Sequence, residues 1–238
     1  MLNEVLLIAS LLVIYSGIIV LFKIFKEQGL YLWTIVATIG ANIEVMIVVN
    51  AFGMEQTLGN ILFASSFLVT DICSELYGKK TAKRAVYLGL ATSISFIFLT
   101  QSWMFYIPNE NDWAMPHIKA VFSNTPRLMI VGIGVYVVVQ TFDVWAYHKW
   151  WDFTSKICGD SHKYLWLRNN GSTLLSQLLN TVLFTVGAFY GTFNVDTLAH
   201  IATASYVIYI VTSLTDTPFV YIARKIKEIE DKNVTIHS

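Results

Sequence analysis

Charged residues are scarce in this chain of 238 residues. Asp, Glu, Lys and Arg together make up 13% of it, whereas hydrophobic residues make up 55%. A soluble domain of this size carries about 25% charged residues, so too few charges remain here to coat a globule with so much apolar side chain. The composition therefore argues against a water-soluble enzyme with one buried core and indicates a polytopic membrane protein.

Other scarcities exclude further classes of protein. The formal net charge is zero, which leaves no basic face of the kind that nucleic-acid binding requires. The two cysteines, Cys73 and Cys158, fit neither a CxxC zinc or redox motif nor a disulfide framework. Four prolines and thirteen glycines, without a low-complexity tract, exclude a fibrous or disordered chain. We expect no metal site, no cofactor and no nucleic-acid partner.

Seven apolar runs are long enough to cross a membrane. A helix needs about 20 residues to span about 30 Å of hydrocarbon, and continuous rather than alternating runs favour helices over barrel strands. The predicted spans are Leu2–Phe22, Tyr31–Phe52, Leu58–Tyr77, Ala85–Ile107, Leu128–Tyr147, Thr173–Phe193 and Leu198–Ile222. Since most of the chain lies inside them, little remains for a soluble domain.

Basic residues gather in alternate connections between these runs. All of the sixteen except Lys119 and Arg127 lie in the first, third and fifth connections or in the C-terminal tail. Because basic connections stay in the cytoplasm, the N-terminus is predicted to face outside and the C-terminus inside. The aromatic and basic fifth connection, Trp150 to Trp166, is predicted to lie along the membrane surface, and no pattern supports a catalytic role for its Asp160 and His162.

Five acidic residues lie inside the predicted spans, namely Glu44, Asp71, Glu75, Asp143 and Asp216. Each costs about 2.5–3.5 kcal/mol at the centre of a membrane helix, so these residues either line a polar cavity or pair with one another. Asp71, Asp143 and Asp216 each lie near the cytoplasmic end of a span that runs inward, and each is followed by a tyrosine and basic residues. This likeness is compatible with an ancient internal repeat.

Helical spacing aligns polar and aromatic residues in stripes on four spans. The stripes are Asn60, Phe67, Asp71 and Glu75; Tyr136, Gln140, Asp143 and Tyr147; Thr173, Gln177, Asn180 and Phe184, with Ser176 beside them; and Tyr209, Ser213 and Asp216. Helix packing explains any single amide, but four stripes at similar depth favour a shared cavity. Carboxylates and amides beside aromatic rings suit a flat ring system with a guanine-like edge. A sugar, an amino acid or a small cation would also fit, so this chemistry leaves the substrate open.

Three strings carry a resemblance to a known family. FLVTDICSELYGKKTAKRAV, LWLRNNGSTLLSQLLNT and LTDTPFVY resemble the most recognisable blocks of the queuosine precursor transporter family, also called the vitamin uptake transporter family. The resemblance covers roughly residues 31–227 in the family's order and spacing. It implies import of 7-deazaguanine compounds: 7-cyano-7-deazaguanine, 7-aminomethyl-7-deazaguanine or queuine. The span at about 2–22 is additional, and we interpret it as retained because it lacks the basic n-region of a signal peptide.

The resemblance also implies site residues, with two departures. The family's acidic pair, polar stripe and final Asp-Thr-Pro fall on Asp71, Glu75, Arg168, Asn169, Ser172, Thr173, Ser176, Gln177, Asp216, Thr217 and Pro218. Relatives often carry an Asp where this chain has Asn180, and a Lys where it has Tyr209. We hypothesise that contact between Asn180 and Tyr209 replaces an ion pair, since losing one partner alone would leave a buried charge unpaired.

We therefore predict an all-α importer with seven transmembrane helices, which forms a single transmembrane domain over residues 1–238 of a multi-pass protein in the bacterial inner membrane. Its partners are a small-molecule 7-deazaguanine and the lipid membrane, and pairing into a homodimer is left open. The residues expected at the substrate site are Phe67, Asp71, Glu75, Asp143, Arg168, Ser176, Gln177, Asn180 and Asp216. Arg168, near the cytoplasmic mouth, is expected to pair with Glu75 or Asp143.

Two other functions compete with this prediction. Small hydrophobic subunits that capture a vitamin for an ATP-driven importer have a similar size and composition. A membrane-embedded hydrolase would use Asp71 and Glu75, four residues apart on one helix, as an acid pair. The hydrolase is disfavoured because no nucleophile motif or metal-ligand set accompanies these acids. The sequence leaves open the preferred 7-deazaguanine, any coupling to protons or ions, and the role of Glu44.

Overall fold

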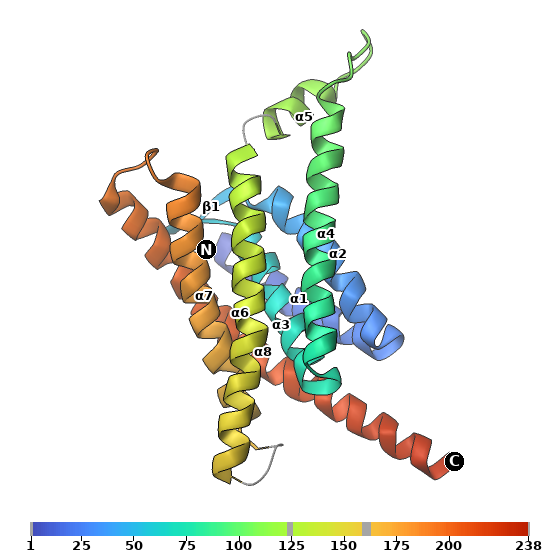
Figure 1. Cartoon of the computed structure of the whole chain (residues 1–238). Helices are drawn as coiled ribbons and strands as arrows, with labels where there is room; N and C mark the ends of the chain where they lie inside the picture. The colour runs from blue at the N-terminus through green and yellow to red at the C-terminus, as the bar shows by residue number, and fades with distance from the viewer. Residues whose placement is uncertain (1, 123–125, 159–162, 238) are drawn as a thin grey trace.

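The computed structural model describes residues 2–122, 126–158 and 163–237. Within them the chain forms α-helices and one short antiparallel hairpin (Figure 1). The elements are α1 (Leu2–Phe25), α2 (Glu27–Glu44), β1 (Val48–Ala51), β2 (Met54–Thr57), α3 (Gly59–Tyr77), α4 (Lys79–Trp103), α5 (Met115–Phe122), α6 (Pro126–Cys158), α7 (Leu165–Phe189) and α8 (Val195–His237). The predicted all-α class is confirmed, and the small hairpin is an addition to it.

Five of the described helices, α1, α4, α6, α7 and α8, are long and apolar enough to cross a membrane. The prediction of a polytopic membrane protein rests on the same property. The second and third predicted spans correspond to α2 and α3, which have 18 and 19 residues. In α3 the run from Ala64 to Ser74 is buried, so this helix can carry polar residues because its neighbours cover them.

The prediction of a helix from Tyr31 to Phe52 is wrong at its C-terminal end. Helix α2 stops at Glu44, and β1 then pairs with β2 to form the hairpin. Phe52 and Gly53 at the turn have φ angles of 54° and 73°, and a two-residue turn with two positive φ angles matches the twist of paired strands. The length of the apolar run did not reveal this change, because a strand rich in valine is as apolar as a helix.

Two helices continue well past their predicted C-terminal ends. Helix α6 continues from the predicted end at Tyr147 to Cys158, and α8 continues to His237. No proline or glycine interrupts the extension of α6, so most of the connection that was predicted to lie along the membrane surface is helix instead. Asp160 and His162 of that connection lie outside the described residues.

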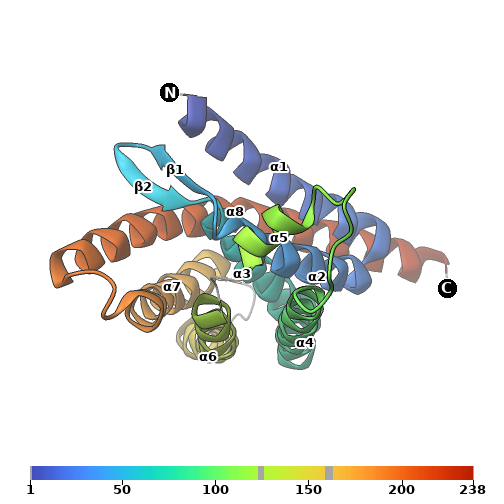
Figure 2. The same ribbon diagram turned by 90° about the horizontal axis from the view of Figure 1, so that it is seen from above.

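Helix α3 lies at the centre of the bundle, in contact with α1, α2, α4, α6 and α8 (Figures 1 and 2). The hairpin and α5 lie toward one end, here called the hairpin end, where Asn3 of α1 donates a hydrogen bond to the Asn50 carbonyl at 2.9 Å. The other end, here called the basic end, carries Lys79 at the start of α4 and Lys163 in the turn before α7. Helix α3 therefore runs from the hairpin end to the basic end.

The additional first helix packs firmly on the bundle. The Tyr15 hydroxyl of α1 donates a hydrogen bond to the Thr212 carbonyl of α8 at 3.2 Å, and its ring meets Phe219 edge to face at 5.3 Å. Tyr15, Ile18 and Phe22 are fully buried. Helix α1 thus contributes to the core through one face, while its opposite face exposes apolar side chains, as a membrane helix does toward lipid.

Substitution of Gly29 tests the tight corner between α1 and α2. A Cβ atom at this position would overlap the backbone carbonyl of Leu21, which cannot yield as a flexible side chain can. We expect Gly29→Ala to lower the free energy of unfolding by about 1–3 kcal/mol, the usual cost of overpacking, in thermal unfolding of the detergent-solubilised protein. Gly17→Ala is the matched control, because its Cβ would meet only Trp33 at 4.0 Å. Equal stabilities of the two variants would contradict this description of the corner.

Candidate functional site

A large cavity opens at the hairpin end of the bundle. It has a volume of about 750 Å³, within the range of about 300–1,000 Å³ of small-molecule sites. Residues of the hairpin and of α2, α3, α4, α5, α6, α7 and α8 line it. Its polar and aromatic lining residues include Thr38, Asn42, Glu55, Gln56, Asn60, Phe63, Ser66, Ser93, Tyr136, Asn180, Thr181, Phe184, Thr185, Phe189, Phe193, Ser205 and Tyr209. This hairpin-end cavity thus combines amides, hydroxyls and aromatic rings.

Three side chains from three helices meet on the wall of the hairpin-end cavity. The Tyr209 hydroxyl of α8 donates a hydrogen bond to Asn60 Oδ1 of α3 at 3.0 Å. Asn180 of α7 interacts with the same hydroxyl. Beside them the Phe63 ring packs against the rings of Tyr136 and Tyr209, with centroids 6.4 and 6.3 Å away. Amide groups that can form hydrogen bonds with the polar edge of a ligand therefore lie next to ring faces on which a flat molecule can stack.

A hydrogen-bonded glutamine closes the floor of the cavity. Gln140 of α6 is fully buried, donates to the Ser66 hydroxyl at 2.5 Å and accepts from the Thr70 hydroxyl at 3.4 Å. Phe67 lies on the same floor, buried between Val135 and Val139 of α6. Since Ser66 lines the cavity and Thr70 lies one turn further along α3, this glutamine links the cavity to the next polar layer.

Three aspartates form that layer in the middle of the bundle. Asp71 of α3, Asp143 of α6 and Asp216 of α8 are all buried, and each accepts one hydrogen bond from α7. The bonds are Thr173 Oγ1 to Asp71 Oδ2 at 3.1 Å, Ser176 Oγ to Asp143 Oδ1 at 2.9 Å, and Asn169 Nδ2 to Asp216 Oδ1 at 2.6 Å. We call these three aspartates the acidic layer. Helix α7 thereby joins three other helices through its hydroxyl and amide side chains.

The acidic layer retains hydrogen-bonding capacity. Asp71 Oδ1, Asp143 Oδ2 and Asn169 Oδ1 are buried and have no hydrogen-bond partner among the residues that the structure describes. The same holds for both polar atoms of the buried Gln177 side chain. Unsatisfied buried acceptors are costly, and such groups are typical of sites that bind a polar molecule. The layer can therefore accept hydrogen bonds from N–H groups.

A buried ion pair lies below the acidic layer, toward the basic end. Arg168 of α7 donates from Nε to Glu75 Oε2 at 2.9 Å and from Nη2 to Glu75 Oε1 at 2.6 Å. The Tyr147 hydroxyl of α6 donates to the same carboxylate at 2.8 Å, and the guanidinium lies over the Trp151 ring at 4.3 Å. Both charged side chains are almost completely buried, so a bidentate pair with additional partners is what permits their burial.

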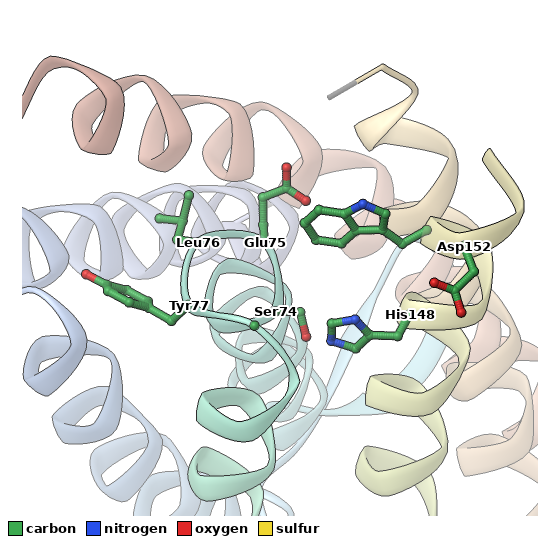
Figure 3. A pocket seen from close by; sticks show the side chains of 8 residues that line it. Ser74, Glu75, Leu76, Tyr77, His148 and Asp152 are labelled. Atoms are coloured by element: carbon green, nitrogen blue, oxygen red, sulfur yellow. The ribbon is translucent and has the colours of Figure 1, made fainter. Parts of the chain in front are cut away.

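A smaller pocket opens beyond this ion pair at the basic end. It has a volume of about 370 Å³ and lies between the end of α3 and the extension of α6 (Figure 3). Its lining residues are Ser74, Glu75, Leu76, Tyr77, Gly78, His148, Trp151 and Asp152. We call it the basic-end pocket. Two cavities are thus arranged along α3, with the acidic layer and the Glu75–Arg168 pair between them.

The predicted site residues are distributed over these levels. Asn180 lines the hairpin-end cavity, Phe67 packs in its floor, and Gln177 and Ser176 are buried near the acidic layer. Asp71, Asp143 and Asp216 make up that layer, and Arg168 pairs with Glu75 rather than with Asp143. Glu44 ends α2 next to the hairpin, but it is Glu55 of the hairpin that lines the cavity.

Several contributing residues were absent from the predicted site. Asn60, Gln140, Tyr147 and Tyr209 lie on the stripes seen in the sequence, so their spacing was a usable signal. His148 and Trp151 belong to the part of α6 that was assigned to a connection, and the missing glycine or proline in that segment would have indicated a longer helix. No pattern marked the hairpin as a wall of the cavity.

Removal of Arg168 tests the ion pair. Arg168→Gln leaves the Glu75 carboxylate buried without its cation, and breaking a buried pair in this way costs about 3–5 kcal/mol of stability. We expect the double variant Glu75→Gln/Arg168→Gln to regain part of that loss, since no unpaired charge remains. Arg224→Gln is the control, because this side chain lies 3.7 Å from Glu75 and is 18% exposed. Thermal unfolding in detergent measures these three variants and the single variant Glu75→Gln, and strictly additive losses of the two single variants would contradict direct coupling between Glu75 and Arg168.

Comparisons of the sequence with known proteins show the family of this chain. Residues 57–223 match the model of the family described as "Putative vitamin uptake transporter". A protein of Bacillus subtilis (strain 168) named "Probable queuosine precursor transporter" is 35% identical over 214 residues, covering 90% of this chain and 91% of that protein. No solved structure matches the chain. The resemblance seen in the sequence is confirmed: the chain belongs to the vitamin uptake transporter family, and it is a multi-pass membrane transporter rather than an enzyme.

Proposed function

We propose that the protein imports 7-deazaguanine precursors of queuosine across the bacterial inner membrane. The name of the Bacillus subtilis relative supports this substrate class. The observation that carries the proposal is the meeting of Asn60, Asn180 and Tyr209 beside aromatic rings in the hairpin-end cavity. Amide and hydroxyl groups hydrogen-bond the polar edge of a guanine-like base, and the ring faces of Phe63 and Tyr136 stack on it.

The path of the substrate follows α3. The base enters the hairpin-end cavity, passes the floor at Gln140 and reaches the acidic layer, where Asp71 and Asp143 each offer an oxygen with no partner among the described residues. The free oxygen of each carboxylate accepts an N–H group of a guanine-like edge. The Glu75–Arg168 pair closes the path toward the basic end, and its opening releases the substrate. Three donors already occupy the Glu75 carboxylate. Glu75 therefore acts on the path by holding Arg168 rather than by binding the substrate itself.

We also propose that seven helices cross the membrane as one domain, with the N-terminus outside and the C-terminus in the cytoplasm. The cluster of Lys79, Lys80, Lys83 and Arg84 at the start of α4 supports this direction. The packing of α1 on α8 supports a single domain that includes the first helix. The hairpin-end cavity then faces the outside, as an importer requires.

Transport by the isolated chain tests the function. The purified protein in liposomes, without ATP or any other protein, is expected to accumulate 7-aminomethyl-7-deazaguanine to equilibrium faster than empty liposomes do. Guanine serves as the control substrate. Binding raises stability with the logarithm of ligand excess, by about 2.7 kcal/mol at 100 times Kd, so a thermal shift in detergent reports binding separately. A thermal shift without transport would instead favour the alternative, a binding subunit of an ATP-driven vitamin importer. The absence of both a thermal shift and transport would contradict both functions.

Two substitutions test the site in the same assay. Asn180→Leu removes an amide from the hairpin-end cavity, and Asp71→Asn removes the acceptor charge from the acidic layer. We expect each to slow uptake roughly tenfold or more, since a hydrogen bond to a charged or buried group contributes about 1.5–3 kcal/mol. Asn50→Leu and Asp196→Asn are the matched controls, because both side chains are exposed and lie outside the cavity. If Asp71→Asn leaves uptake intact, the assignment of the acidic layer fails, and if Glu75→Gln also leaves it intact, the Glu75–Arg168 pair has no role in transport.

A further inference from the structure

Two rigid elements shape the basic-end pocket, so it is more than an opening at the end of the proposed substrate path. Helix α3 ends at Tyr77, and Gly78 follows with a φ of 83°, a conformation that favours glycine. The extension of α6 forms the opposite wall through His148, Trp151 and Asp152 (Figure 3). Its volume of about 370 Å³ lies within the range of about 300–1,000 Å³ typical of small-molecule sites.

One wall of this pocket is a parallel pair of rings. The imidazole of His148 and the indole of Trp151 are one turn apart on α6, and their planes differ by 3° with centroids 6.0 Å apart. The guanidinium of Arg168 lies over the indole at 4.3 Å, so the ion pair that closes the path also restrains Trp151. Parallel ring faces of this kind offer stacking surfaces to a planar base whatever its substituents.

Both walls of the pocket supply polar groups that have hydrogen-bonding capacity to spare. Ser74 is 1% exposed, and its hydroxyl has no hydrogen-bond partner among the described residues. His148 Nε2 is likewise buried without a partner in that part of the chain. Figure 3 shows the Ser74 and His148 side chains directed toward the same space, with the Asp152 carboxylate at its edge. A hydroxyl, an imidazole nitrogen and a carboxylate together can pair with the N–H and carbonyl groups of a guanine-like edge.

The pocket also lies directly beyond the closure of the path. Glu75 lines the pocket and is at the same time the partner of Arg168. A molecule that leaves the acidic layer when this pair opens therefore enters the basic-end pocket next. Its chemistry repeats that of the hairpin-end cavity, where ring faces also lie beside amides and hydroxyls.

We propose that the basic-end pocket is a second binding subsite, which holds the transported planar base by stacking on His148 and Trp151 and by hydrogen bonds to Ser74 and Asp152 before its release into the cytoplasm. This inference rests on the proposed function. According to this inference, the protein has a separate affinity for the substrate on its cytoplasmic side. The residues that determine this affinity differ from those that determine the affinity on the outside.

Transport measured from each side tests the subsite. The probe is 7-aminomethyl-7-deazaguanine, offered to right-side-out and to inverted membrane vesicles that contain the full chain. We expect His148→Ala to raise KM about tenfold in inverted vesicles and to leave KM unchanged in right-side-out vesicles, because loss of one stacking partner costs about a factor of ten in affinity. His148→Phe keeps a flat ring and is expected to retain most of the affinity.

Two further variants separate the subsite from a structural effect. Asp152→Asn changes an exposed side chain that packing does not require, and it is expected to raise KM in inverted vesicles only. Phe153→Ala is the matched control, because this side chain is 53% exposed on the same helix and does not line the pocket. Three results would overturn the subsite. They are an equal change of KM in both kinds of vesicle, a change of KM confined to right-side-out vesicles, and an unchanged KM in both His148→Ala and Asp152→Asn. If wild-type vesicles do not move the probe at all, the proposed function itself fails.

Discussion

The burial of charge between helices is the constraint on which the rest of this structure depends. Arg168 is a fully buried guanidinium, and a cation in this position is tolerable only with a complete set of partners. Glu75 of α3, Trp151 of α6 and the Lys163 carbonyl before α7 contact the guanidinium, and Tyr147 of α6 donates to the paired Glu75 carboxylate. Because these partners come from α3, from α6 and from the segment before α7, the pair fixes how these helices approach one another at the basic end.

Helix α7 has a similar role one level higher. Its side chains donate to the carboxylates of α3, α6 and α8, so one helix gives a hydrogen bond to each of three buried acids. On α8 these contacts fall beside Pro218, which removes a backbone hydrogen bond within the helix. Asn170 adds a hydrogen bond to the Thr217 hydroxyl at 2.7 Å. Side chains of α7 thus support α8 at the point where its own backbone is weakest, and a change in the acidic layer reaches both helices together.

The two cavities follow from this arrangement. Polar residues on α3 recur from Asn60 to Glu75, and at 1.5 Å per residue this places successive binding groups at increasing depth along a single helix. The cavity and the pocket are separated by polar layers rather than by a thick apolar barrier. A transporter needs this combination, because its substrate must exchange hydrogen bonds at each step without crossing a region that offers none.

The sequence by itself determined the class of the protein, its family and most of its helices. Scarce charge and long apolar runs reflect burial in lipid, which acts on each segment independently of the others. The helical stripes also predicted which faces carry polar groups, and therefore that Asp71, Asp143 and Asp216 share a region. These properties are local or periodic, so one chain read from end to end contains them.

Only the tertiary structure decided how those residues are divided among the hairpin-end cavity, the acidic layer and the Glu75–Arg168 pair. The sequence allowed Arg168 to pair with Glu75 or Asp143, and the structure pairs it with Glu75 of α3. The end of α2 and the hairpin depended on a turn at Phe52 and Gly53 that an apolar run conceals. The pocket at His148 and Trp151 exists because α6 continues beyond the length a membrane requires. The hairpin and the length of α6 are local features that hydropathy alone does not distinguish, whereas the pairing of Arg168 and the approach of α6 to the end of α3 are set by distances between segments far apart in the chain, about which hydropathy and spacing carry no information.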